Sequence, residues 1–192
     1  MNEAIKKGLT DSAELKLALC SDKYVDIISE IVKASIDTIS RGGKIIIAGN
    51  GGSAADAQHI AAELVGRYLK DRKAIAALAL TTDTSSMTAI ANDLGFEKIF
   101  SRQIDALGNR GDLFLAISTS GESANLVEAI KSARQAGLFT VSFLGKGGGR
   151  MGGLADIDLT VPSGDTPRIQ EAHITIGHLV CEAIENKAGT PE

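Results

Sequence analysis

Residues 112–123 read DLFLAISTSGES, and this stretch decides the fold class. An apolar run from Leu113 to Ile117 ends in hydroxyl side chains and a glycine, and a segment with helical periodicity, residues 124–136, follows directly. We predict a buried strand that opens into a polar loop at a helix N-terminus, where free N–H groups and O–H donors suit a phosphate. The alternative is an ordinary strand-to-helix turn with Ser123 as the N-cap. Four hydroxyls in six residues favour a small phosphorylated ligand.

Apolar runs alternate with helical patterns over most of the chain. Strands are predicted at residues 44–49, 74–81, 112–119, 139–145 and 158–161. Helices are predicted at residues 3–20, 22–40, 53–65, 84–92, 96–107, 124–136 and 167–186. Continuous apolar strands separated by helices predict an α/β fold, a doubly wound parallel five-stranded sheet flanked by helices. We expect a single domain over residues 1–192, with N-terminal helices at about 3–40 and an α/β core at about 44–187.

Composition excludes several classes of partner. The 192 residues are 44% hydrophobic, enough for one substantial core. A net charge of −4 without a Lys/Arg-rich stretch argues against nucleic acid. No apolar run approaches the ~20 residues of a membrane span and no signal core opens the chain, so we expect a cytoplasmic protein with no membrane partner. Cys20 and Cys181 lack CxxC spacing and are expected to be buried thiols in a reducing compartment.

A second polar loop, GNGGSA at residues 49–54, ends the first predicted strand. Its GxGxxA pattern is similar to a dinucleotide fingerprint, but no acidic residue ends the next strand about 20 positions on, so an NAD-dependent oxidoreductase is a distant third hypothesis. A P-loop is excluded because GxxxxGK[ST] does not occur. The stretch GKGGG at 145–149 is predicted to be a mobile surface loop rather than a phosphate cradle.

The two polar loops are expected to face one pocket, because ligands of open parallel sheets bind beyond the carboxyl ends of the strands. Backbone N–H groups of Gly51 and Gly52 would serve one end of the ligand. Hydroxyls of the other loop would hold its other end, namely those of Ser118, Thr119, Ser120 and Ser123.

The chain has only three histidines, which makes their positions informative. His59 and Glu63 are spaced i, i+4 and lie on one face of the helix that follows the glycine loop. Gln170 and His178 can be presented from one side of the last helix. A histidine and a carboxylate one turn apart form a common metal pair, which two further ligands would complete, although the same pair is also common at surfaces.

The other candidates on and near the last helix have structural alternatives. Thr166 is predicted as its N-cap, with Pro167 at the first helical position. His173 is expected in the core or behind the ligands. Arg67 and Arg168 are candidates either for salt bridges in solvent or for contacts to a phosphate or hydroxyl.

Five motifs in order resemble those of the phosphoheptose isomerases, which are sugar-isomerase (SIS) domain enzymes. They are GNGGS at 49–53, QHIAAEL at 58–64, AND at 91–93, STSGES at 118–123 and RIQEAH at 168–173. The resemblance runs from about residue 10 to 187 and implies a SIS-type sheet. It implies conversion of D-sedoheptulose 7-phosphate to D-glycero-D-manno-heptose 7-phosphate, the first step of ADP- or GDP-heptose supply for lipopolysaccharide core or surface polysaccharide. It also implies a cytoplasmic homotetramer with active sites at subunit interfaces and one zinc ion per subunit.

The resemblance assigns roles to residues of this chain. Glu63 and His178 would be the acid/base pair of an enediol mechanism, with Glu63 moving the carbon-bound proton and His178 serving the oxygens. The zinc ligands would be His59, Glu63, Gln170 and His178. The substrate contacts would be Asn50, Gly51, Gly52, Ser53, Glu63, Arg67, Asn92, Asp93, Ser118, Thr119, Ser120, Ser123 and Gln170.

A non-catalytic SIS-domain regulator that binds the replication initiator protein is the alternative. That class lacks the carboxylate of Glu63 and the imidazole of His178, so this chain's residues favour the enzyme. Some isomerases place an aspartate where this chain has Pro167, which leaves open whether Asp165 takes part in ring opening. We expect Glu63 and His178 to meet across a subunit boundary.

Overall fold

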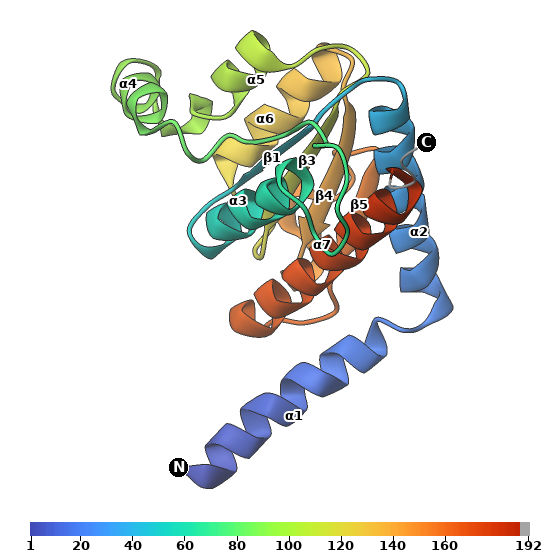
Figure 1. The fold of residues 1–192 in the computed structure, drawn as a ribbon. Coiled ribbons are helices and arrows are strands. Elements are labelled where there is room, and N and C mark those ends of the chain that lie inside the picture. Colours follow the sequence, from blue (N-terminus) through green and yellow to red (C-terminus); the bar gives the residue numbers. More distant parts are fainter. Residues whose placement is uncertain (189–192) are drawn as a thin grey trace.

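The computed structural model describes residues 1–188, and residues 189–192 of the expected domain lie outside this description. Five strands form one sheet in the order β2-β1-β3-β4-β5, and all pairings are parallel (Figure 1). The strands are β1 (Ile45–Gly49), β2 (Ala77–Ala79), β3 (Leu113–Ser118), β4 (Phe139–Leu144) and β5 (Ile157–Thr160). The predicted five-stranded parallel α/β fold is confirmed.

Helices cover both faces of the sheet because alternate strand residues point to opposite sides. Ile45 and Ile47 belong to one core cluster, and Ile46 belongs to the other. The first cluster lies beneath α2 (Asp22–Ser40), α3 (Gly52–Val65) and α7 (Thr166–Ala188). The second lies beneath α4 (Thr84–Leu94), α5 (Ser101–Leu107) and α6 (Ala124–Gln135), with the 3₁₀ helices η1 (Phe96–Lys98) and η2 (Lys146–Met151) beside them.

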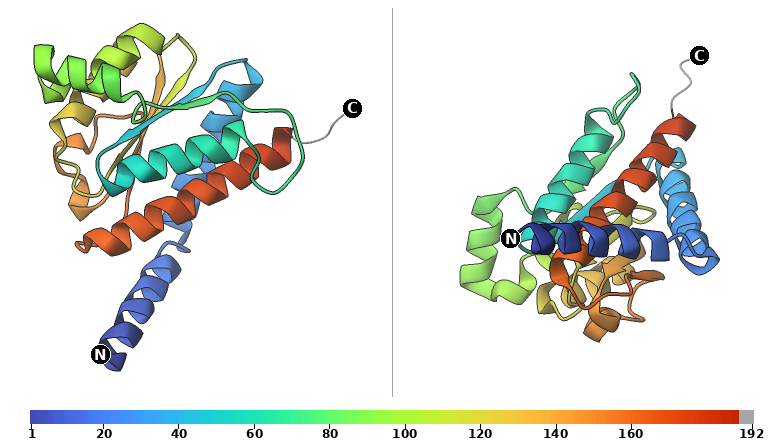
Figure 2. Two further views of the ribbon diagram at one scale, coloured as in Figure 1. Left: turned by 60° about the vertical axis from the view of Figure 1, so that its left-hand side comes forward. Right: turned by 90° about the horizontal axis from the view of Figure 1, so that it is seen from below.

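The N-terminal helix α1 (Asn2–Ala18) projects away from this body and contacts it through α7 (Figures 1 and 2). It has no buried residue. Cys20 follows this helix and is exposed, so its predicted burial is wrong, whereas Cys181 is buried as expected. None of the described helices combines the length and apolar character needed to cross a membrane.

Several predicted boundaries differ from the structure. The strand expected at 74–81 shortens to β2 because it is an edge strand with a partner on one side only. The helix expected at 96–107 divides into η1 and α5, since Ile99 and Phe100 turn into the core between them. Helix α7 begins at Thr166, which is therefore its first helical residue and not its N-cap.

The stretch predicted as a mobile surface loop, residues 145–149, leads into the 3₁₀ helix η2 and is only partly at the surface, since Lys146, Gly147 and Gly149 are exposed. Gly148 and Met151 are buried in this turn. The Met151 N–H donates to the Gly121 carbonyl at 2.9 Å, and a Cβ on Gly121 would collide with Gly148. The turn therefore packs against the serine loop and supports it.

Candidate active site

The serine loop, residues 118–123, is held by its own hydroxyls at the carboxyl end of β3. Ser118 Oγ accepts the Gly121 N–H at 3.0 Å and lies 3.3 Å from Ser123 Oγ. Ser120 Oγ accepts the Glu122 N–H at 3.2 Å. Ser123 occupies the N-cap position of α6, but its side chain makes no capping bond. The first N–H groups of α6 are therefore not taken up by this hydroxyl, which is the arrangement that an anion site needs.

The glycine loop lies beside the serine loop, joined to it by a pair of amides. Asn50 Nδ2 donates to Asn125 Oδ1 at 3.0 Å, and Asn125 Nδ2 donates to Asn50 Oδ1 at 2.9 Å. Gly51 and Gly52 are exposed, and Gly51 has a φ of 56°, which favours glycine. The structure thus places both loops at the carboxyl ends of the strands, as predicted from the sequence.

Two histidines and a carboxylate converge between α3 and α7, which pack side by side (Figure 1). His59 Nε2 lies 2.8 Å from His178 Nε2 and 3.2 Å from Glu63 Oε1. One ligand atom from each of the three side chains lies within 4.8 Å of the other two. Glu63 and His178 therefore meet within one chain, and the expectation that they meet across a subunit boundary is wrong. The reason is that both helices cover the same face of the same sheet.

Gln170, on α7, lies beside the start of α3. Its amide occupies the space that a Cβ on Gly52 would need. Asp56 lies near it and is buried, with Oδ2 unpartnered among residues 1–188. Burial raises the pKa of Asp56 to about 6, against the opposing effects of His59 and the Gln170 amide. Asp56 was missed in the sequence, although its spacing from His59 and Glu63 puts it on their helix face.

Three other predicted contact residues lie outside this cluster. Asn92 and Asp93 are exposed on α4 and bond to each other at 2.7 Å. Helix α4 packs mainly against η1. Arg67 is exposed in the segment that follows α3.

Arg168 and His173 have structural partners. Arg168 donates to the Gly8 carbonyl and pairs with Glu171 at 2.6 Å, so it joins α1 to α7. His173 is fully buried and its Nε2 donates to the Leu144 carbonyl at 3.0 Å. Burial lowers the pKa of His173 to about 4. The expected core position of this histidine is confirmed.

Tyr68 is a second residue that sequence reasoning missed. Its ring stacks on His178, with centroids 5.6 Å apart and planes 28° apart. No periodic pattern marks it, because it lies in the irregular segment between α3 and β2.

A parallel sheet with a serine-rich loop at the carboxyl end of a central strand is the arrangement that a known family of domains shares. Residues 11–145 match the family model described as the SIS domain.

Close relatives define the family more narrowly. The phosphoheptose isomerase of Sulfurimonas denitrificans is 50% identical over 97% of this chain and 96% of its own. Phosphoheptose isomerase 1 of Campylobacter jejuni is 55% identical over 88% of this chain and 91% of its own. The solved phosphoheptose isomerase of Neisseria gonorrhoeae superposes with a TM-score of 0.91 at 40% identity, covering 96% of this chain and 98% of that one. The chain belongs to the phosphoheptose isomerases of the SIS domain family and is an isomerase acting on a sugar phosphate.

Proposed function

We propose that the protein converts D-sedoheptulose 7-phosphate into D-glycero-D-manno-heptose 7-phosphate. The observation that carries this proposal is the convergence of His59, Glu63 and His178 within one chain. A carboxylate and an imidazole close together are what an enediol mechanism requires. The relatives that resemble this chain are named phosphoheptose isomerases, which supports the same substrate class.

Each acid/base residue has a distinct step. Glu63 removes a proton from C1 of the ketose and returns one to C2, with the enediol between these events. His178 carries a proton from the oxygen on C1 to the oxygen on C2. Each positioned group of this kind contributes about 10²–10⁴-fold to the rate.

The serine loop would bind the phosphate through neutral donors. Hydroxyls of Ser118, Ser120 and Ser123 cluster there together with the N-terminus of α6. The residues proposed to contact the sugar come from the glycine loop and the start of α3, from the serine loop and from α7: Asn50, Gly51, Gly52, Ser53, Thr119 and Gln170. Binding energy from the phosphate then holds C1 and C2 against the acid/base pair.

The donor set of the cluster fits a zinc ion. Two imidazole nitrogens and one carboxylate oxygen are typical zinc ligands, and they are near enough to one another to share an ion. We propose His59, Glu63 and His178 as ligands, with Gln170 as the fourth. When bound to all four side chains, zinc would have no open position for the substrate carbonyl and would instead hold the pocket in shape. Metal content of the purified protein, measured before and after chelation together with activity, tests this assignment.

We also propose a cytoplasmic homotetramer with active sites at subunit interfaces, which supplies ADP- or GDP-heptose synthesis for lipopolysaccharide core or surface polysaccharide. Helix α1 supports the assembly because Ile5, Leu9 and Leu17 are 57%, 69% and 70% exposed on it. In such an assembly Arg67, Asn92 and Asp93 would contact substrate at shared sites. Light scattering of the purified protein measures the assembly, and a monomer with full activity would contradict it.

Turnover of sedoheptulose 7-phosphate tests the proposed function directly. The wild-type protein should form the aldose, and Glu63→Gln should lose activity by at least about 10²-fold while folding normally. Glu182→Gln is the matched control, because Glu182 is exposed on α7. A Glu63→Gln variant with nearly normal turnover would refute the role of this carboxylate.

A further inference from the structure

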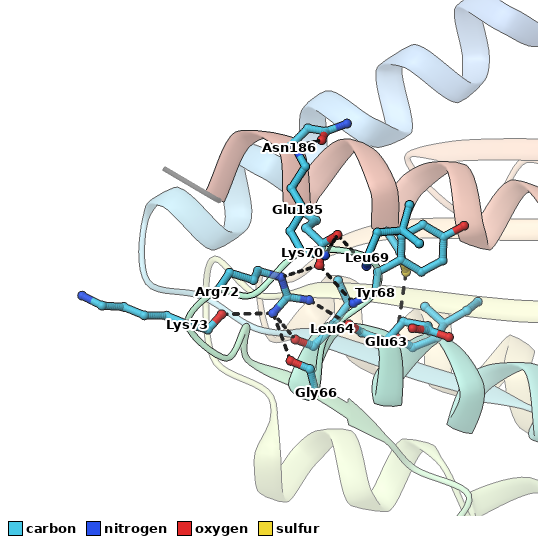
Figure 3. A network of polar contacts seen from close by, with 12 residues as sticks. Glu63, Leu64, Gly66, Tyr68, Leu69, Lys70, Arg72, Lys73, Glu185 and Asn186 are labelled. Carbon is cyan, nitrogen blue, oxygen red and sulfur yellow. Dashed lines mark hydrogen bonds and ion pairs between the residues drawn. The ribbon is translucent and has the colours of Figure 1, made fainter. Parts of the chain in front are cut away.

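A buried ion pair behind the acid/base residues organises the segment that follows α3. Arg72 and Glu185 have side chains that are only 1% and 2% exposed, and Arg72 Nε donates to Glu185 Oε1 at 3.1 Å. Figure 3 shows the guanidinium of Arg72 lying between Glu185 and the end of α3. A charge pair this deeply buried is costly unless its remaining hydrogen-bonding capacity is satisfied.

Both partners satisfy that capacity with backbone groups. Glu185 accepts the N–H groups of Tyr68, Leu69 and Lys70 at 3.0, 2.7 and 2.9 Å. Arg72 donates to carbonyls at the end of α3, which are those of Glu63 at 2.8 Å and Leu64 at 2.9 Å (Figure 3). The pair therefore fixes the backbone of Tyr68 against α7 and, at the same time, the last turn of α3.

The fixed backbone brings the Tyr68 ring onto His178. The rings of Tyr68 and His178 are stacked with their centroids 5.6 Å apart. The ring of His59 meets the same His178 ring edge-on, with centroids 5.0 Å apart. Within residues 1–188 no hydrogen bond holds the Tyr68 hydroxyl, so the contact is made by the ring. Stacking on one side and the His59 contact leave the imidazole of His178 few orientations.

We infer that Tyr68, fixed by the Arg72–Glu185 pair, is a positioning residue that holds the His178 imidazole in its reactive orientation. This inference rests on the proposed role of His178. A misplacement of about 1 Å can cost on the order of 10²-fold in rate, so a freed imidazole should lower kcat more than it changes KM.

Paired variants at Tyr68 separate the ring from the hydroxyl. Tyr68→Phe keeps the ring and should keep kcat within about twofold, whereas Tyr68→Ala should lower kcat by on the order of ten- to a hundredfold with KM nearly unchanged. Tyr24→Ala, at the chain's other tyrosine, controls for the loss of an aromatic ring elsewhere. A normal kcat in Tyr68→Ala, an equal loss in Tyr68→Phe, or a loss confined to KM would each overturn the inference.

A spectroscopic readout on the metal-free protein is independent of turnover. With carbon-labelled histidine the chain gives signals from three imidazoles only. The His178 ring protons should lose the ring-current displacement in Tyr68→Ala and retain it in Tyr68→Phe and Tyr24→Ala. Glu185→Gln should shift the same signals if it folds. If it does not fold, the Tyr68 variants alone test the inference. An unchanged His178 signal in Tyr68→Ala overturns the inference, whereas an inactive wild-type protein with the expected signals would contradict the proposed function alone.

Discussion

Removing the charge of Glu185 should destabilise the fold strongly. The carboxylate accepts hydrogen bonds from three backbone N–H groups and from Arg72, and its side chain is 2% exposed. In Glu185→Gln the guanidinium of Arg72 stays buried without a counter-charge. The amide also brings N–H donors toward backbone N–H groups that need an acceptor.

The size of the loss follows from the depth of burial. Breaking a buried ion pair by removing one partner costs about 3–5 kcal/mol. For a chain of this length each kcal/mol lowers Tm by roughly 2–4 °C, so Tm should fall by roughly 6–20 °C. Glu182→Gln removes the same charge from an exposed position of the same helix and should stay within about 0.5 kcal/mol of the wild type.

The pH dependence of this difference has a definite sign. Burial raises the pKa of Glu185. The N–H groups of residues 68–70 and the Arg72 guanidinium together lower it by more than burial raises it, so the net pKa lies below 4.5. A carboxylate with a lowered pKa stabilises the fold above its unfolded pKa, and that stabilisation is lost as pH falls through the folded value. The gap between wild type and Glu185→Gln should be full at pH 7 and shrink as pH falls below 4.5.

Urea unfolding followed by circular dichroism, at equal protein concentration, measures this gap. The reasoning fails if Glu185→Gln matches Glu182→Gln at pH 7. It fails equally if the gap keeps its size at pH 3, because the charge of Glu185 would then not be its source.

Three further outcomes are expected. Ser123→Ala should raise KM for the sugar phosphate by about tenfold or more and leave Tm nearly unchanged, because its hydroxyl makes no capping bond and only one long contact, at 3.3 Å to Ser118 Oγ; steady-state kinetics and a melting curve check this. Gly52→Ala should displace the Gln170 amide and lower zinc content and kcat at little cost in Tm, as metal analysis with kinetics would show, and normal metal binding would contradict the Gln170 assignment. His173→Gln should flatten the fall in unfolding free energy between about pH 6.5 and 4, since the unfolded chain binds a proton there that the buried imidazole, with its pKa of about 4, does not; an unchanged slope in urea titrations would refute this.

The sheet and both polar loops could be predicted because they depend on local patterns. Continuous apolar runs mark strands that are buried on both faces, as in β3, where every residue is buried. The exception was β2, which is shorter than its apolar run predicted. It lies at the edge of the sheet and pairs with β1 on one side only. Cys20 failed for a related reason, since residue type alone does not reveal that the preceding helix projects from the body.

The triad could be predicted only in part from spacing. His59 and Glu63 are one helical turn apart, which is visible in the sequence. His178 is 119 residues from His59, and only the family resemblance linked them. Their meeting within one chain follows from the packing of α3 on α7, which depends on which face of the sheet each helix crosses.

The support of the triad was hidden for a different reason. Glu185 and Arg72 act mostly on backbone N–H and carbonyl groups, and such partners leave no residue pattern along the chain. Yet α7 connects the triad to the ion pair that supports it. His178 and Glu185 are seven residues apart and so lie within about 20° of each other around the helix axis. One stripe of α7 thus carries His178, the proposed acid/base residue, and, two turns later, the carboxylate of Glu185 that holds the backbone of Tyr68. The same stripe explains why a charge so costly to bury is placed there: in this site it orders backbone that no apolar side chain could order, since only an acceptor can satisfy three converging N–H groups.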